Sequence, residues 1–318
     1  MRPLPRRLRV LAPLLGVALA AAACATSPTP RSAAPSVRPP PSARPITPAI
    51  TWRAMTQRPT KVLVLVEENK TDQAALTGMP YLASLARTYG RASDYHAIRH
   101  PSLPNYLAIA GGSTFGVTDD AFPSRHRLTG PSVFDRAIAT GHTAKTYAEA
   151  MPASCSLTST TRYGVKHNPW AYFADAGPHA SCRRFDVPMG TTTSGALRSD
   201  VVAGRLPTVG LAVPDICHDG HSCSLRVADD WLRSWLPVIF AGPDFRRGQL
   251  AVVVTFDEDD KSADNKVLTV VMSHATSHLT ATSPYTHYSL SRYLSEVAGT
   301  TPLRLAARAA DFRAAFHL

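Results

Sequence analysis

Residues 61–69 have the sequence Lys-Val-Leu-Val-Leu-Val-Glu-Glu-Asn, an unbroken aliphatic run that ends in polar residues. A second run, Leu-Ala-Val-Val-Val-Thr-Phe at 250–256, is followed by Asp-Glu-Asp-Asp at 257–260. Short apolar runs without alternation are typical of strands that are buried on both faces of a parallel sheet. These two stretches therefore predict a parallel sheet with carboxylates gathered at one edge.

Other segments fit strands and helices that alternate along the chain. We expect strands at 142–148, 209–213 and 267–272, and helices at 81–89, 132–140, 229–240 and 286–298. Pro237 is expected to interrupt or end the third of these helices. The alternation predicts an α/β fold, a three-layer sandwich around a central, mostly parallel sheet, in which ligands bind at the carboxyl ends of the strands.

Composition and charge limit the classes of protein to which the chain can belong. The 318 residues are 44% hydrophobic and 18% charged, which suits a globular domain, expected at 60–318. The net charge is +11, but the first 60 residues contain nine arginines and no lysine or acidic residue. The rest carries 25 basic and 23 acidic residues, without a basic stripe interleaved with aromatic residues. We therefore expect no nucleic-acid partner.

The N-terminal 24 residues resemble a bacterial export signal. Arginines within residues 2–9 precede an apolar run from Val10 to about Ala23, too short for a permanent membrane helix. The signal ends in Ala-Ala-Ala-Cys, similar to a lipobox in which Cys24 is acylated, and plain secretion is the alternative. Residues 25–59, rich in Pro, Ala, Ser and Thr, predict a disordered tether. We expect an extracytoplasmic protein, secreted or held to the cell membrane through a lipid anchor at most.

The five cysteines agree with export. If Cys24 carries lipid, four remain, an even number in an oxidising compartment. Cys217 and Cys223 are close in sequence and are expected to form a disulfide, which leaves Cys155 with Cys182. Four cysteines allow three pairings, and the alternatives are free buried thiols or a zinc ion bound by Cys217 and Cys223.

The polar residues after the two aliphatic runs predict a metal site. Neighbouring parallel strands lie about 4.8 Å apart, so carboxylates at their ends would repel unless a cation neutralises them. The predicted ligands of a divalent metal ion, whose identity stays open, are Glu68, Asn69, Asp257 and Glu258. Asp259 and Asp260 are expected to form a solvated acidic turn.

A candidate nucleophile lies between these carboxylates in sequence. Residues 100–106 read His-Pro-Ser-Leu-Pro-Asn-Tyr, which places Ser102 between two prolines. The prolines are expected to keep the backbone extended and the hydroxyl out of a helix. A serine beside a metal can attack phosphorus, because coordination lowers the pKa of its hydroxyl.

Four motifs occur in a particular order: Glu-Asn at 68–69, Ser-Leu-Pro-Asn at 102–105, Pro-Asp-Ile-Cys-His-Asp-Gly-His at 214–221, and Thr-Phe-Asp-Glu at 255–258. Together they resemble the bacterial phosphoesterase family of acid phosphatases and phospholipases C, within the alkaline-phosphatase-like superfamily. The resemblance covers about residues 60–300 and is strongest to secreted acid phosphatases of the mycobacterial type, which act on phosphatidylinositol 3-phosphate. It departs at 70–72, where Lys-Thr-Asp replaces a segment that often contains phenylalanine.

The resemblance implies an alkaline-phosphatase-like fold, metal ligation by the four residues above, and Ser102 as nucleophile. Asp219 and His221 are expected to face the site, where His221 could ligate a second metal, bind phosphate or protonate the leaving alkoxide. We predict substrate contacts for His100, Asn105 and, on the resemblance, His287. Five other histidines are taken as surface or packing residues: His126, His142, His167, His179 and His317.

These features predict an exported, metal-dependent phosphomonoesterase that forms a phosphoserine intermediate, with a phosphoinositide as one candidate substrate. Phospholipase C members commonly have Asp-His-Val where residues 259–261 are Asp-Asp-Lys, which favours a monoesterase. The nearest alternative is a phospholipase C-type phosphodiesterase that acts on membrane lipids. An alternative of another class is a surface lipoprotein that binds without catalysis.

Overall fold

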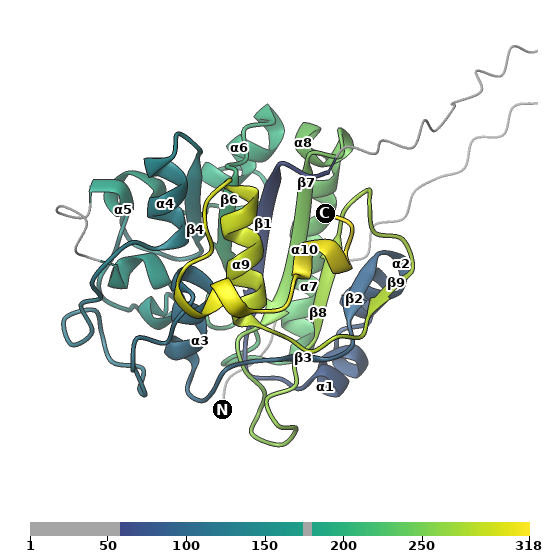
Figure 1. Cartoon of the computed structure of the whole chain (residues 1–318), viewed down its shortest axis with the longest axis horizontal. Helices are drawn as coiled ribbons and strands as arrows, with labels where there is room; N and C mark the ends of the chain where they lie inside the picture. Colours follow the sequence, from purple (N-terminus) through teal and green to yellow (C-terminus); the bar gives the residue numbers. More distant parts are fainter. Residues whose placement is uncertain (1–57, 174–179) are drawn as a thin grey trace, which may run out of the picture. The chain divides into compact units, whose positions relative to one another are not determined.

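The computed structural model describes residues 58–173 and 180–318, which form a sheet with helices on both faces (Figure 1). The strands of its main sheet are, in spatial order, β5 (Asp186–Pro188), β4 (Ala144–Ala148), β6 (Val209–Val213), β1 (Lys61–Glu67), β7 (Leu250–Phe256), β8 (Thr269–Met272), β2 (Gly90–Ala92) and β9 (Leu279–Ala281). A separate pair consists of β3 (Tyr95–His96) and β10 (Tyr285–Thr286).

The sheet is mostly parallel, as predicted. β1 pairs in parallel with β6 on one side and β7 on the other, and β4 continues the parallel arrangement beyond β6. Only the pairs that β8 makes with β7 and β2 are antiparallel within the described sheet. All of β6 and β7 and nearly all of β1 is buried, because helices cover both faces.

The helices form two layers. One layer contains α1 (Asp72–Gly78), α2 (Pro80–Thr88), α6 (Ala196–Ala203), α7 (Leu225–Ala241) and α8 (Pro243–Arg246). The other contains α3 (Ser102–Gly111), α4 (Val133–Ala139), α9 (His287–Val297) and α10 (Phe312–Ala315), and Figure 1 looks onto the face that carries α9. Short segments complete the fold: α5 (Ala180–Phe185) and the 3-10 helices Val165–His167, Pro169–Tyr172 and Arg304–Arg308. The predicted three-layer α/β fold is confirmed.

Helix α7 begins earlier and continues further than the sequence predicted. Pro237 lies inside it rather than ending it, because the apolar side of the helix packs on the core through residues such as Trp235 and Leu236. Asp229 of α7 is buried, and its carboxylate accepts the backbone N–H groups of Tyr81 and Leu82, both at 2.9 Å. These are donors of the first turn of α2, which a helix cannot satisfy internally. One buried carboxylate therefore joins two helices of the same layer.

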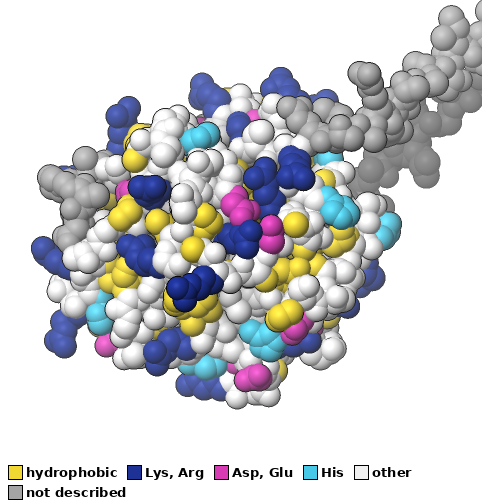
Figure 2. All heavy atoms as spheres, in the orientation of Figure 1, with side chains coloured by type: hydrophobic (Ala, Val, Ile, Leu, Met, Phe, Trp, Pro, Cys, Tyr) yellow, Lys and Arg dark blue, Asp and Glu magenta, His cyan; other side chains and the backbone are white. Residues whose placement is uncertain are grey.

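Two disulfides, Cys155–Cys182 and Cys217–Cys223, are present as expected. Such bonds are typical of proteins from oxidising compartments, and they agree with a location outside the cytoplasm. Within the described residues, no helix has the length and apolar character needed to cross a membrane. The predicted signal, Cys24, residues 25–57 of the predicted tether and His179 lie outside the described residues. On the face shown in Figure 2, Lys and Arg side chains are scattered rather than gathered in one stripe.

Candidate active site

Three parallel strands end side by side, with carboxylates at their ends. The last residue of β1, Glu67, pairs with Phe256 of β7. Glu68 and Asp257 follow directly, and the loop after β6 returns to the same edge, where the carbonyl of Asp219 accepts the N–H of Glu68 at 2.8 Å. The side chains of these acidic residues are buried. The prediction that carboxylates gather at the carboxyl ends of the strands is confirmed.

Asn69 connects two of these carboxylates. Its backbone N–H donates to Asp257 Oδ1 at 3.0 Å, and its side-chain amide donates to Glu68 Oε2 at 2.8 Å. The residue has a φ of 53°, in the left-handed region that asparagine tolerates better than most residues. The turn after β1 therefore holds Glu68 and Asp257 beside each other.

Ser102 is the first residue of α3, and only 1% of it is exposed. Its hydroxyl donates to Glu68 Oε2 at 3.1 Å. The expectation that the flanking prolines keep Ser102 out of a helix is wrong. Pro101 is the extended N-cap, and Pro104 lies in the first turn, where a proline lacks only an N–H that would have no partner within the helix. The helix thus begins at the predicted nucleophile.

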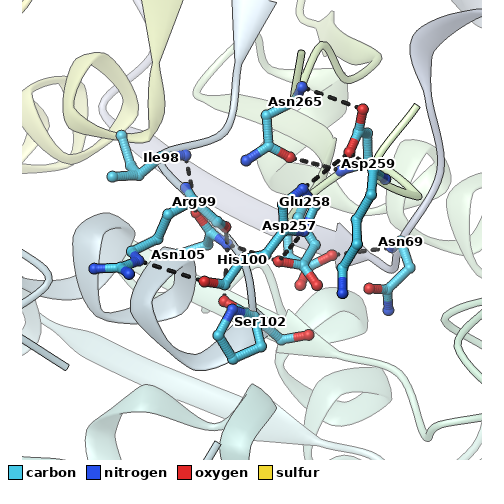
Figure 3. A network of polar contacts seen from close by, with 12 residues as sticks. Asn69, Ile98, Arg99, His100, Ser102, Asn105, Asp257, Glu258, Asp259 and Asn265 are labelled. Carbon is cyan, nitrogen blue, oxygen red and sulfur yellow. Dashed lines mark hydrogen bonds and ion pairs between the residues drawn. The ribbon is translucent and has the colours of Figure 1, made fainter. Parts of the chain in front are cut away.

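Asn105, one turn further along α3, holds the segment that leads into Ser102. Its Oδ1 accepts the N–H groups of Ile98 at 2.9 Å and Arg99 at 3.2 Å, and its Nδ2 donates to the carbonyl of Arg99 at 2.6 Å (Figure 3). The side chain is fully buried. Its contacts position the backbone beside the nucleophile, and substrate binding by Asn105 stays a prediction.

His100 lies between two carboxylates that follow β7. Its Nδ1 is 2.9 Å from Glu258 Oε2, and its Nε2 is 3.1 Å from Asp259 Oδ1. Asp259 is 1% exposed, so the expectation of a solvated turn is wrong for this residue, whereas Asp260 is exposed as expected. The carboxylate of Asp259 accepts backbone N–H groups from Lys261, Ala263 and Asn265. It is buried because it organises the loop that follows the site.

The loop at 214–223 places one buried and one exposed group at the same edge. The disulfide between Cys217 and Cys223 closes this loop, so the alternative of zinc bound by these cysteines is wrong. Asp219 is fully buried, and its Oδ1 accepts the N–H of His221 at 2.8 Å. The ring of His221 is exposed, with Nε2 3.3 Å from the ammonium of Lys166. The loop therefore extends from the buried cluster to solvent.

His167 is a site residue that the sequence analysis missed. It is fully buried, with Nε2 3.2 Å from Glu68 Oε1 and Nδ1 3.1 Å from Asp219 Oδ2. The phenol of Tyr106 donates to the same Glu68 oxygen at 2.5 Å, and its ring stacks on His167. His167 follows an irregular stretch on a short 3-10 helix, where no periodicity or motif marks it.

His287 supports the site from within the protein. The ring is fully buried, and its nitrogens contact the carbonyl of Asp257 at 2.6 Å and the hydroxyl of Tyr95 at 3.1 Å. Burial lowers its pKa to about 4, so the ring is neutral at neutral pH. These contacts lend no support to substrate binding by His287, which stays a prediction.

Burial and neighbouring negative charges raise the pKa values of the carboxylates of the site. Burial raises the pKa of Asp219 and of Asp257 to about 7, and burial together with the charge of Asp257 raises that of Glu258 to about 9. Burial and the charges of Asp257 and Asp219 hold the pKa of Glu68 well above its usual value. Burial also lowers the pKa of His167 to about 3. Desolvated carboxylates beside a neutral imidazole favour the arrival of a cation.

The donor groups fit a divalent metal ion. Both ring nitrogens of His167, Asp219 Oδ2 and Asp257 Oδ2 are buried without hydrogen-bond geometry to any partner, although His167 lies at pairing distance from two carboxylates. Buried polar atoms without partners are rare, and a bound ion would satisfy them. Glu68, His167 and His221 each offer an atom within 4.8 Å of the others. Carboxylate oxygens and neutral imidazoles are common ligands of such ions.

A comparison with protein families identifies the class of enzyme to which the chain belongs. The sequence model of the Phosphoesterase family matches residues 73–299, which is most of the folded part of the chain. The chain belongs to the phosphoesterase family. It is therefore a hydrolase that acts on phosphoric ester bonds, and the alternative of a binding protein without catalysis has no support.

Curated relatives include phosphatases from bacteria and fungi. The chain is 31% identical over 242 residues to a phosphatidylinositol-3-phosphatase of Mycobacterium tuberculosis, a match that covers 75% of this chain and 76% of that protein. It is 31% identical over 248 residues to a phosphate-repressible acid phosphatase of Penicillium chrysogenum, covering 74% and 57% of the two chains. The chain therefore spans little more than half the length of that fungal relative.

Solved structures confirm the fold at much lower identity. A protein of the alkaline phosphatase superfamily from Vibrio parahaemolyticus has a TM-score of 0.54 and 10% identity, over 80% of this chain and 71% of that one. At this identity the likeness concerns the fold alone. It confirms the predicted alkaline-phosphatase-like architecture.

Proposed function

We propose that this phosphoesterase is an exported, metal-dependent phosphomonoesterase with Ser102 as its nucleophile. One observation carries the proposal: the Ser102 hydroxyl lies 3.1 Å from Glu68 at the start of a buried helix, at the edge where three strands deliver carboxylates. A helix N-terminus favours negative charge, as on a transferring phosphoryl group. Placement of a hydroxyl here is therefore suited to attack on phosphorus.

Two groups of residues would hold metal ions, and Glu68 belongs to both. Asn69 and Asp257 lie beside Glu68 on the side of Ser102, and His167 and His221 lie on its other side. This favours metal ligation among the three roles open to His221, since a lowered pKa keeps its imidazole neutral; burial is the main cause and Lys166 adds to it. When bound, a metal ion would lower the pKa of the serine hydroxyl and offset charge on a phosphoryl oxygen.

The residues of the chain would then act as follows. The Ser102 oxygen forms a bond to phosphorus while the bond from phosphorus to the ester oxygen breaks. Glu68 already accepts the hydrogen bond of this hydroxyl and is placed to take its proton. The departing alkoxide takes a proton from water, and the hydroxide that this leaves attacks the phosphoserine. As the bond from phosphorus to the Ser102 oxygen breaks, Glu68 returns its proton to that oxygen and the hydroxyl is restored. Lys166 contributes positive charge beside His221, where a phosphate would approach from solvent.

The proposed substrate is a phosphate monoester, and a phosphoinositide is the first candidate to examine. The relative from Mycobacterium tuberculosis is named for that substrate, and the match covers three quarters of both chains. The two disulfides and the predicted signal support export, and acylation of Cys24 would make the chain a lipoprotein. That lipid would then anchor the chain in the membrane.

The test is a comparison of substrates on the full chain. We expect hydrolysis of p-nitrophenyl phosphate and phosphatidylinositol 3-phosphate, loss of both activities with Ser102→Ala, and loss with chelator that added metal reverses. Preference for bis-p-nitrophenyl phosphate would make the chain a phosphodiesterase of the phospholipase C type. Full activity of Ser102→Ala would contradict the serine mechanism, and full activity in chelator would contradict the metal requirement.

A further inference from the structure

An exposed apolar pocket lies beside the proposed active site. The large apolar side chains most exposed in the described part of the chain are Phe122 (51%), Leu157 (41%), Val202 (53%) and Leu305 (51%). Single exposed apolar residues are normal and need no explanation. Phe122 and Leu157 differ from the other two because both line one pocket of about 240 Å³, although they belong to separate loops.

The loop that carries Phe122 is fixed to the nucleophile helix. The N–H of Leu103, the residue after Ser102, donates to Asp120 Oδ1 at 2.9 Å, and Lys166 donates to the other oxygen of Asp120 at 2.8 Å. Phe122 is two residues further on, and two residues span at most about 7 Å. The loop that lines the pocket is therefore tied to the start of the helix that carries Ser102.

The pocket also has a free cation. Arg127 is exposed and lines the pocket with Phe122 and Leu157. Its guanidinium makes no hydrogen bond or ion pair with the residues that the structure describes. An apolar recess beside an unpaired cation has the chemistry of an amphiphile site, where acyl chains meet the apolar residues and an anionic headgroup meets the arginine.

We propose that the Phe122 pocket, formed by Phe122, Leu157 and Arg127 with their neighbours, docks on an anionic lipid surface. A stable protein partner would need roughly 800 Å² on each side, whereas here two apolar side chains and one cation provide the contact. Docking would present phosphate esters carried by lipids to the rim of the Ser102 site. This consequence rests on the proposed function, but the docking itself does not.

The experiment measures binding of the full chain to vesicles of phosphatidylcholine, with and without phosphatidylglycerol. The test variant is Phe122→Ser/Leu157→Ser, and the matched control is Val202→Ser/Leu305→Ser, which removes equally exposed apolar side chains elsewhere. The leader is the same in every variant and contributes equally. We expect the test variant to bind anionic vesicles about tenfold more weakly than the control, and Arg127→Gln to lose about fivefold.

Turnover separates this proposal from the proposed function. All variants should hydrolyse p-nitrophenyl phosphate like the wild type, while the test variant alone should lose activity on phosphatidylinositol 3-phosphate in vesicles. Equal vesicle binding by the test and control variants would overturn the docking proposal. Binding that is equally strong with and without phosphatidylglycerol would also overturn it. Absence of all turnover with intact vesicle binding would overturn the proposed function and leave the docking surface standing.

Discussion

Glu68 is the residue at which the contacts of the site meet. One of its oxygens accepts hydrogen bonds from Ser102 and Asn69. The other accepts from Tyr106 at 2.5 Å and lies 3.2 Å from His167. The side chain is fully buried, so its position is set by these neighbours and not by solvent. Replacement of a residue that contacts either oxygen of Glu68 should therefore affect Ser102, which donates its hydroxyl to Glu68.

Replacement of His167 tests the part of the site that has no sequence motif. We expect His167→Ala to lower kcat by about 100-fold and to weaken metal binding, because the change removes a proposed ligand and a contact of Glu68. Tyr106→Phe is the control, since it keeps the stacked ring and removes only one hydrogen bond to the same oxygen. Wild-type activity and metal content in His167→Ala would rule out its place in the site.

Asp259 and Asp260 are adjacent carboxylates with opposite surroundings. Burial alone would raise the pKa of Asp259, but the N–H groups of Ala263, Lys261 and Asn265 outweigh it and hold the pKa below its usual value. Asp259→Asn should lower the free energy of unfolding by about 1–3 kcal/mol, and Asp260→Asn by less than about 0.5 kcal/mol. The contribution of Asp259 is present above pH of about 4 and is lost as the pH falls below it.

Urea unfolding of the two variants at neutral and acidic pH measures this difference. Equal stability of both variants at neutral pH would show that the loop does not depend on Asp259. A difference that persists unchanged at low pH would show that the effect is not electrostatic.

At the scale of elements, helix α3 carries both the nucleophile and the residue that positions it. Ser102 and Asn105 are one turn apart, and every residue from Ser102 to Gly111 is buried. The helix is held at its start by polar contacts and along its length by apolar packing. Substitutions in α3 can therefore distinguish loss of the nucleophile from loss of the residue that positions it.

Comparison of Ser102→Ala with Asn105→Ala should distinguish the role of the nucleophile from that of the positioning residue. We expect Ser102→Ala to abolish turnover while the free energy of unfolding changes by less than about 1 kcal/mol. Asn105→Ala leaves the N–H groups of Ile98 and Arg99 without their partner, so it should lower that free energy by about 1–3 kcal/mol and reduce activity. Thermal unfolding and p-nitrophenyl phosphate turnover give both numbers. A stable, fully active Asn105→Ala would contradict the positioning role.

The elements that the sequence predicted are those with a continuous local signal. The aliphatic runs of β1 and β7 can be buried only as central strands, so the carboxylates that follow them could be placed in advance. Ser102 lies beside one of these carboxylates, Glu68, but its helix was missed because proline is compatible with a first helical turn as well as with extended chain. His167 could not be found, since its neighbours Glu68 and Asp219 come to it through long-range folding.

At the scale of the whole molecule, the buried carboxylates make stability depend on pH and on metal. Without metal, burial favours the neutral forms of Asp219, Asp257 and Glu258, whose pKa values of about 7, 7 and 9 lie above their unfolded values. Their contribution to stability is fully present below pH of about 4 and is lost as the pH rises toward about 9. Metal binding requires the charged forms and should reverse this trend.

Thermal unfolding of the full chain, with and without chelator, tests the trend. We expect the metal-free protein to be less stable at about pH 8 than at about pH 5, and metal at 100 times its Kd to add about 2.7 kcal/mol at the higher pH. Asp186 is a control outside the site, because burial also raises its pKa to about 7. Asp186→Asn should weaken the pH trend and leave the metal effect unchanged. A metal-free protein that gains stability with rising pH would contradict this account.

The central claim is that Ser102 becomes covalently phosphorylated during turnover. The most direct measurement is mass spectrometry of the full chain after rapid acid quenching of a reaction with p-nitrophenyl phosphate, followed by digestion. The account predicts a phosphate on Ser102 in the wild type and none in Ser102→Ala. A phosphate on another residue, or active enzyme that never carries a phosphate at Ser102, would contradict it.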